Sequence, residues 1–174
     1  MAERFQVPLE EVAAALAAGS RAPHRMALAE ALSGARVIDD TYNASPVSTL
    51  AALEFLAETP LPPGRRRLAV LGDMLELGPD EEELHRQVGE RAGRIVDGLV
   101  TVGERARLIA EGARAAGLAR VASAADLHQA EAIVDRVLDP GVGDLLLVKG
   151  SRGVELDRLV ATLTGVSKAD RETG

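Results

Sequence analysis

Short apolar runs alternate with segments of helical periodicity from about residue 36 to near residue 163. The runs are continuous and rich in valine, leucine and isoleucine, which is typical of strands buried on both faces of a sheet. The expected strands cover residues 35–39, 68–71, 99–102, 119–122 and 144–148. Continuous rather than alternating apolar runs favour a parallel sheet enclosed by helices.

The segments between these runs carry apolar residues three and four positions apart, a spacing that places them on one face of a helix. The four stripes are Val47, Leu50, Leu53 and Ala57; Leu84, Val88, Ala92 and Ile95; Leu127, Ala130, Val134 and Val137; and Leu156, Leu159, Val160 and Leu163. A further helix is expected over residues 104–116. The alternation predicts an α/β fold, with a Rossmann-like, mostly parallel sheet of about five to six strands and helices on both faces.

Several helix starts are marked by local sequence. Ser45 followed by Pro46 predicts an N-cap and a proline in the first turn. Pro79 is followed by Asp80, Glu81 and Glu82, whose charge is favourable in the first turn of a helix. Ser123, with Asp126 three positions later, predicts a capping box.

The beginning of the chain differs from the rest. An alanine-rich segment over residues 9–18 has helical character with no strand before it, and residues 19–24 resemble a linker. We therefore expect residues 1–30 to be a helical remnant of a preceding domain together with its linker. Residues 31–165 are expected to form the α/β domain, and residues 166–174 a polar tail.

Composition narrows the functional classes. The 174 residues are 47% hydrophobic, which is enough to fill the core of one domain. The net charge of −7 argues against a general nucleic-acid binder, which carries a basic face. No apolar run approaches the ~20 residues that cross a bilayer, and no secretory signal is seen, so membrane insertion is not expected. The absence of cysteine excludes disulfides and thiolate metal sites.

Polar residues gather where expected strands end. The one asparagine and the one tyrosine of the chain are neighbours, Tyr42 and Asn43, within the polar stretch 39–43. Two further polar stretches, residues 72–74 and 149–152, also follow expected strands. The carboxyl ends of parallel strands meet at one edge of a sheet, where open α/β sheets bind ligands. We therefore expect the three stretches to converge on a ligand site.

Each candidate in the first stretch has a chemical and a structural interpretation. Asp39 and Asp40 are consecutive, so in an extended strand they point to opposite faces and only one of them faces a ligand. Such a carboxylate either holds a hydroxyl, a metal-bound water or an ammonium, or it caps the following turn. Asn43 offers a donor and an acceptor together, although asparagine is also common in turns. Tyr42 either stacks on a base or sugar or packs against the protein.

The stretch Lys149, Gly150, Ser151 and Arg152 follows an apolar strand. Lysine and arginine supply positive charge for a carboxylate or a phosphate, and glycine permits close backbone approach. The alternative is a helix N-cap at Ser151 flanked by solvated cations.

Asp73 and His85 are two further polar candidates, and several common nucleotide-binding and catalytic motifs are absent from the sequence. Asp73 either binds a ligand or caps a loop, and His85 lies beside an apolar stripe, where a histidine is more often packed than catalytic. No pair of histidines has metal-ligand spacing. The chain has no G-x-x-x-x-G-K-[ST], no G-x-G-x-x-G and no G-x-S-x-G. It therefore lacks a phosphate cradle of its own.

Five blocks in order resemble the MurF family of Mur ligases, the UDP-N-acetylmuramoyl-tripeptide–D-alanyl-D-alanine ligases. Residues 39–46 are similar to the family signature D-D-[TS]-Y-N-A-N-P, with Ser45 where the family usually has a second asparagine. Residues 71–78 resemble the second block. His85 with residues 88–89, then residues 101–103, and then residues 148–152 follow in family order.

The resemblance implies the carboxy-terminal domain of a three-domain, monomeric, cytoplasmic bacterial enzyme of peptidoglycan precursor synthesis. In this family ATP phosphorylates the tripeptide carboxylate, and the amine of D-alanyl-D-alanine attacks the acyl phosphate. ATP and Mg²⁺ are the implied cofactors, and the metal ligands are expected upstream of this chain. Because the P-loop belongs to the central domain, the chain alone is expected to be inactive, and its own amino-terminal and central domains are its expected partners.

The same resemblance implies roles for individual residues. Asp40 and Asn43 are expected at the reaction centre. ATP is expected to contact Arg25, Asp39, Asp40, Tyr42 and Asn43. D-alanyl-D-alanine is expected to contact Asn43, Lys149, Gly150, Ser151 and Arg152.

Two other functions remain open at the level of sequence. The first is a stand-alone module that binds a nucleotide or an amino acid without catalysis. Tight ATP binding by the chain alone would favour it, because two domains build the ATP site in a Mur ligase. The second is a folate polyglutamate ligase, which is disfavoured because those relatives usually carry a histidine at the position of Asn43.

Overall fold

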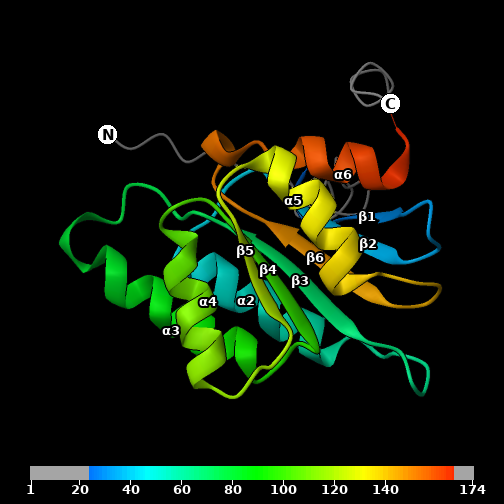
Figure 1. The fold of residues 1–174 in the computed structure, drawn as a ribbon, viewed down its shortest axis with the longest axis horizontal. Helices are drawn as coiled ribbons and strands as arrows, with labels where there is room; N and C mark the ends of the chain where they lie inside the picture. The colour runs from blue at the N-terminus through cyan, green and yellow to red at the C-terminus, as the bar shows by residue number, and fades with distance from the viewer. Residues whose placement is uncertain (1–23, 167–174) are drawn as a thin grey trace, which may run out of the picture.

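A computed structural model describes residues 24–166 of the chain. In these residues a six-stranded sheet with the order β1-β2-β6-β3-β4-β5 is covered by helices on both faces (Figure 1). The strands are β1 (Ala27–Glu30), β2 (Arg36–Asp40), β3 (Arg67–Gly72), β4 (Gly98–Val102), β5 (Val121–Ala124) and β6 (Leu145–Lys149). The helices are α2 (Pro46–Glu58), α3 (Glu81–Gly93), α4 (Ala106–Ala115), α5 (Leu127–Ile133) and α6 (Leu156–Thr164). The predicted α/β fold class is confirmed.

The sheet is parallel from β2 to β5, and β1 alone runs antiparallel, beside β2 at one edge. The sequence pattern predicts no strand at β1 and places its residues in the preceding segment. The sheet therefore begins four residues before the expected boundary at residue 31. The expected helix over residues 9–18, most of the linker and nearly all of the polar tail lie outside the described residues.

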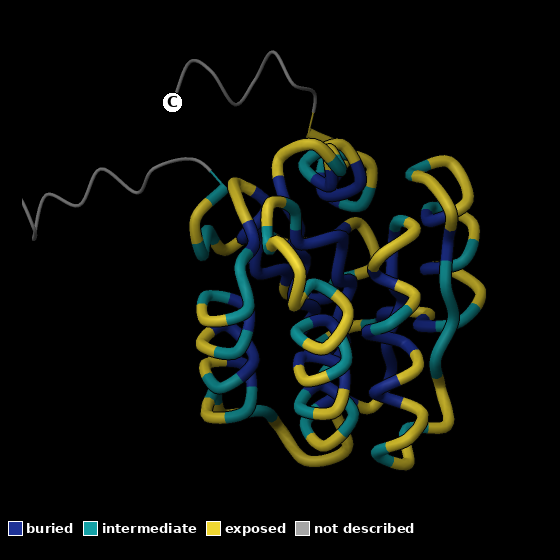
Figure 2. The backbone as a smooth tube through the Cα atoms, turned by 90° about the vertical axis from the view of Figure 1, so that its left-hand side faces the viewer, coloured by how far each residue is buried: buried dark blue, intermediate teal, exposed yellow. Residues whose placement is uncertain are grey.

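The four inner strands, β2, β6, β3 and β4, are buried on both faces apart from their first residues in β2 and β3, as their continuous apolar sequences predict. Alternate residues of the strands contact different helices, so the sheet separates two apolar clusters. One cluster joins the sheet to α2, α3 and α4, and the other joins it to α5, α6 and the π-helical turn Val134–Leu138. Figure 2 shows the buried backbone between helices whose outer turns are exposed. This two-sided packing fixes where the carboxyl ends of the strands lie.

Two helix details differ from the expected pattern. In α2 the buried residues are Thr49, Ala52, Leu53 and Leu56. Val47, expected on the apolar stripe, is 80% exposed because it lies in the first turn, beyond the core. In α5 the N-cap is Asp126, whose side chain accepts from Gln129 N, and Ser123 lies in β5 instead of forming a capping box. The predicted N-cap Ser45 of α2 is confirmed, with a capping box to Ser48.

Helices α3 and α4 lie side by side on one face of the sheet and approach each other through glycines (Figure 1). A Cβ placed on Gly89 would overlap the backbone carbonyl oxygen of Ile109, and one on Gly112 would overlap that of Arg86. The absent side chains therefore permit direct contact between the two helix backbones. The Val88-Gly89 block singled out in the sequence has this packing role.

At the amino-terminal ends of β3 and β6, on the far side of the sheet from the strand carboxyl ends, Arg66 and Asp144 form an ion pair. Asp144, which precedes β6, accepts hydrogen bonds from the Arg66 side chain at 2.6 Å and from the Arg66 and Gly141 backbone amides. Burial raises the pKa of Asp144, but the hydrogen bonds from Arg66 and Gly141 outweigh it and hold the pKa below its usual value. This charged cluster joins the β3 and β6 starts and lies away from the candidate site.

Candidate functional site

The three polar stretches meet because β6 lies between β2 and β3 in the sheet. The helix that follows β6 covers one face, whereas the helices that follow β2 and β3 cover the other. Neighbouring strands whose chains leave toward opposite faces form a crevice at their carboxyl ends. The expected convergence is therefore present, and β6 stands at its centre.

Lys149 joins the end of β6 to the end of β2. Its ammonium donates to Asp40 Oδ2 at 2.5 Å and to the carbonyl oxygen of Asn43 at 2.8 Å. Lys149 is only 3% exposed. The sequence predicts that this cation binds an anionic ligand. In the structure its charge is instead balanced by Asp40. Asp40 also accepts a hydrogen bond from the Met26 amide through Oδ1.

Asp39 is buried as well and bonds within the protein. Its Oδ2 lies 2.8 Å from Nδ1 of His24, and its Oδ1 accepts from the amide and hydroxyl of Thr41. The sequence predicts that one of the two carboxylates faces a ligand. In the structure both Asp39 and Asp40 turn toward protein partners and hold the chain as it leaves β2.

Ser151 connects all three strand ends. Its hydroxyl donates to the carbonyl oxygen of Ala44 at 3.3 Å and accepts from the Leu75 amide at 3.0 Å, while its own amide donates to Asp73 O. The side chain of Ser151 caps no helix. These contacts favour the linking role over the simple N-cap that sequence analysis left open.

Gly150 and Gly72 lie against each other where β6 and β3 end. The Cα of Gly72 lies 3.2 Å from where a Cβ on Gly150 would stand, and the Leu156 side chain lies 2.9 Å from it. The close approach expected of Gly150 is therefore made to Gly72 and Leu156.

Two arginines, a tyrosine and an asparagine are exposed beside the ends of β2 and β6. They are Arg25, Tyr42, Asn43 and Arg152. The guanidinium carbon of Arg25 lies 4.1 Å from the Tyr42 ring centroid, and that of Arg152 lies 5.9 Å from it. Such cation–π contacts gather two positive charges beside one aromatic ring. We call these four residues the exposed rim.

Asn43 occupies the rim directly above the buried ion pair. Its Oδ1 accepts from the Ala44 amide at 2.8 Å, and its own carbonyl oxygen accepts from Lys149. Backbone and side-chain oxygens of Asn43 are thus held by the protein, whereas its amide nitrogen donates to none of the residues described here. A fixed, exposed amide donor at a strand end suits the stabilisation of a developing negative charge.

Asp73 has a structural partner in α4. Its Oδ1 accepts from the Ala106 amide at 2.7 Å, in the first turn of that helix. Gly103 has a φ of +113°, and a Cβ on it would overlap the Asp73 carboxylate. The residue 71–78 and 101–103 blocks therefore fit together, and Asp73 holds α4 instead of reaching the rim.

The other polar candidates are distributed as follows. His85 is buried in α3 and contacts the Met74 amide.

Among residues 24–166, no group of three histidine or acidic side chains is placed to hold a metal ion. No helix in the same range has the length and apolar character needed to cross a membrane. Both site carboxylates are engaged by protein groups, so we derive no metal-dependent step from this chain.

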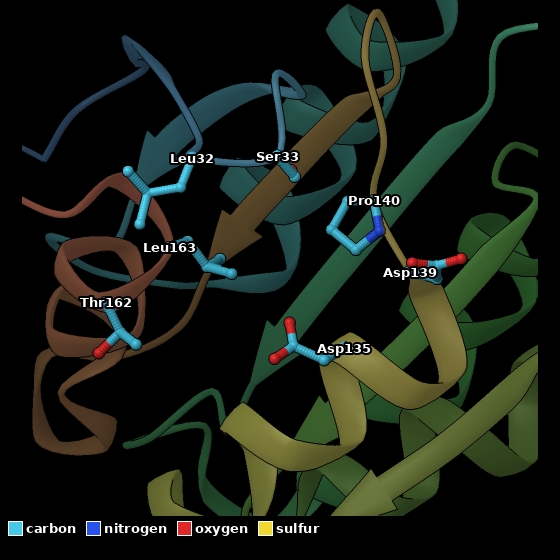
Figure 3. Close-up of a pocket in the computed structure, with 7 residues that line it drawn as sticks. All are labelled: Leu32, Ser33, Asp135, Asp139, Pro140, Thr162 and Leu163. Carbon is cyan, nitrogen blue, oxygen red and sulfur yellow. The ribbon is translucent and has the colours of Figure 1, made fainter.

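A cavity of about 290 Å³ lies elsewhere, between the turn after β1, the end of the π-helical turn and the end of α6 (Figure 3). Its lining includes Leu32, Leu163 and Pro140 together with the exposed carboxylates of Asp135 and Asp139. None of the candidate site residues lines it, so it is separate from the strand ends beside β6.

Comparison with known proteins accounts for the blocks that form this edge. The family model described as Mur ligase, glutamate ligase domain, matches residues 24–152. The chain belongs to the Mur ligase family. A UDP-N-acetylmuramoyl-tripeptide–D-alanyl-D-alanine ligase of Mycobacterium leprae is 38% identical over 176 residues, which cover 90% of this chain and 33% of that protein.

Solved Mur ligases have the same fold. The structure of MurF from Acinetobacter baumannii matches with a TM-score of 0.75 and 26% identity, covering 91% of this chain and 34% of that one. MurF from Thermotoga maritima, in complex with ADP, matches with a TM-score of 0.69 and 28% identity, covering 87% of this chain and 33% of that one. The chain spans about a third of the length of the Mur ligases it matches.

The partners that hold the strand ends at this site are not evident from local sequence. In the sequence His24 looks incidental, and neither the Thr41 contact with Asp39 nor the Lys149–Asp40 pair is expected. The composition offered one clue, because Lys149 is one of only two lysines in an arginine-rich chain. The lysine ammonium is a compact point charge on a flexible stem, and here it reaches both Asp40 Oδ2 and the Asn43 carbonyl oxygen.

Proposed function

We propose that this chain is the carboxy-terminal domain of an ATP-dependent ligase that adds D-alanyl-D-alanine to UDP-N-acetylmuramoyl-tripeptide. The observation that carries the proposal is the exposed rim over the Lys149–Asp40 pair, in a chain 38% identical to a ligase of that name. The stand-alone binding module is not favoured, because the curated relatives that match are ligases.

The reaction joins a carboxylate to an amine. ATP supplies a phosphoryl group that activates the tripeptide carboxylate, and phosphate leaves after the dipeptide amine attacks. A solved relative holds ADP, which supports the use of ATP. This chain has no phosphate-cradling loop. We therefore assign the cradle, and the Mg²⁺ that accompanies ATP, to the preceding domains of the full-length protein in the bacterial cytoplasm.

The exposed rim fits the anionic parts of these reactants. Arg25 and Arg152 carry positive charge into solvent beside Tyr42, in a chain whose net charge is −7. We propose that Arg25 and Tyr42 contact ATP when the domains close. Arg152 is proposed to hold the carboxylate of D-alanyl-D-alanine, for which a guanidinium is well suited.

Asn43 is proposed to act at the reaction centre. Its amide nitrogen is available to donate to the tetrahedral intermediate or to the dipeptide. The expected contributions of Asp39, Asp40, Lys149, Gly150 and Ser151 are proposed to be indirect, because these residues are buried or packed against the protein. They hold the backbone from which the rim projects, and catalysis by this domain is chiefly positioning.

The proposed function is tested by ligation assays on the full-length protein and on the 174-residue chain. The full-length protein is expected to form the D-alanyl-D-alanine adduct only with ATP present, and the chain alone is expected to form none. The measurement is chromatography of the nucleotide-linked product. A full-length protein that fails to use D-alanyl-D-alanine would refute the proposed substrate. Ligation by the chain alone would refute the division of labour between domains.

A further inference from the structure

His85 is a fully buried histidine of α3 that the proposed reaction does not use. Its Nε2 accepts a hydrogen bond from the Met74 amide at 3.1 Å, and its Nδ1 lies 2.7 Å from the Glu81 carbonyl oxygen. A backbone amide only donates and a carbonyl only accepts, so the contacts assign the proton to Nδ1. Both ring nitrogens are used inside the protein, so His85 does not touch a reactant.

Met74 lies in the loop after β3, and this loop holds Ser151 from two sides. The Ser151 amide donates to Asp73 O at 3.0 Å, and the Leu75 amide donates to Ser151 Oγ at 3.0 Å. Met74 stands between these two partners. The Met74 sulfur also contacts the Thr49 hydroxyl of α2 at 3.7 Å. Fixing the Met74 amide therefore fixes both groups that position Ser151.

Ser151 passes this constraint to the rim. Its hydroxyl donates to the carbonyl oxygen of Ala44, directly after Asn43, and Arg152 follows it in the chain. Hydrogen bonds and short stretches of backbone thus connect α3 through the β3 loop to Ser151 and Ala44, the chain neighbours of Arg152 and Asn43. His85 stands at the buried end of this connection.

We propose that His85 is a positioning residue, which holds the Met74 amide and thereby keeps Arg152 in register with Asn43. The consequence for ligation rests on the proposed function, whereas the consequence for the loop does not. Leucine fills a similar volume but leaves the buried Met74 amide without an acceptor. Glutamine has both an acceptor and a donor and replaces the two imidazole contacts in kind.

The loop is tested by amide hydrogen exchange on the 174-residue chain. His85→Leu is expected to lower protection at Met74 and Leu75 by about tenfold or more, with Val100 in β4 unchanged. His85→Gln is expected to lose less protection at the same amides. Unchanged protection in His85→Leu, or an equal loss at Val100, would overturn the local role.

The effect on ligation is tested by steady-state kinetics of the full-length protein. His85→Leu is expected to raise the KM for D-alanyl-D-alanine by about tenfold and to leave the KM for the nucleotide-linked tripeptide unchanged. His85→Gln is expected to restore the dipeptide KM to within about threefold. The matched control is His128→Leu, at an exposed position on α5 across the sheet, and it should have no effect.

The possible outcomes separate the two claims. A normal dipeptide KM in His85→Leu, despite a loosened loop, would overturn the positioning role. A wild-type protein that does not ligate would instead refute the proposed function, and the exchange measurement would still decide whether His85 holds the loop.

Discussion

Replacing Lys149 with methionine is expected to lower the free energy of unfolding of the 174-residue chain by roughly 3–5 kcal/mol. Methionine fills most of the volume but leaves the buried Asp40 carboxylate without its cation. The change also removes the hydrogen bond to the Asn43 carbonyl oxygen. Chemical denaturation followed by circular dichroism measures the loss.

A double-mutant cycle isolates the ion pair. Adding Asp40→Asn to Lys149→Met removes the uncompensated charge, so the two changes should couple by roughly 2 kcal/mol. The matched control is Arg158→Met, which breaks an exposed pair with Glu155 and should cost less than about 1 kcal/mol. Equal losses for Lys149→Met and Arg158→Met would contradict the assignment of Lys149 as a buried link between β2 and β6.

Replacing Gly89 with alanine is expected to destabilise the chain by about 3 kcal/mol or more. The added Cβ would overlap the Ile109 carbonyl oxygen, which is backbone and cannot rotate away. Helices α3 and α4 would have to separate, and the apolar contacts of Val88 and Ala92 would loosen with them. The midpoint of urea unfolding reports the change.

Gly141→Ala is the matched control for this prediction. Gly141 has an ordinary backbone conformation, and the nearest atom to an added Cβ is Asp144 Oδ2 at 4.0 Å. The same chemical change should therefore alter stability by less than about 0.5 kcal/mol. If Gly89→Ala and Gly141→Ala had equal effects, the close helix contact would not contribute as described.

The sequence predicted most of the fold because buried parallel strands have continuous apolar runs that local periodicity reveals. Strand β1 was not predicted, because it is short, lies antiparallel at the edge of the sheet and has only half-buried or exposed residues. The stripe of α2 was misjudged at Val47, because its periodicity continues into a first turn that projects beyond the core.

The position of the site was predictable, but its internal contacts were not. Strand ends on one edge follow from a parallel sheet, whereas the Lys149–Asp40 pair depends on β6 lying between β2 and β3. That strand order brings together residues that are more than half the chain apart in sequence. A contact of this kind produces no local sequence pattern from which it could be predicted. The contact of Asp73 is equally hidden, because its partner Ala106 is the first residue of α4, which connects β4 to β5.

We propose that this edge supplies half of a ligase active site, with Asn43 at the reaction centre. The direct measurement is kcat/KM for ATP-dependent ligation of D-alanyl-D-alanine by the full-length protein carrying Asn43→Ala. The matched control is Gln87→Ala, which removes an exposed amide from α3. We predict a loss of about 100-fold or more for Asn43→Ala, with an unchanged unfolding midpoint and full activity in Gln87→Ala. Wild-type kcat/KM in the Asn43→Ala protein would contradict the account.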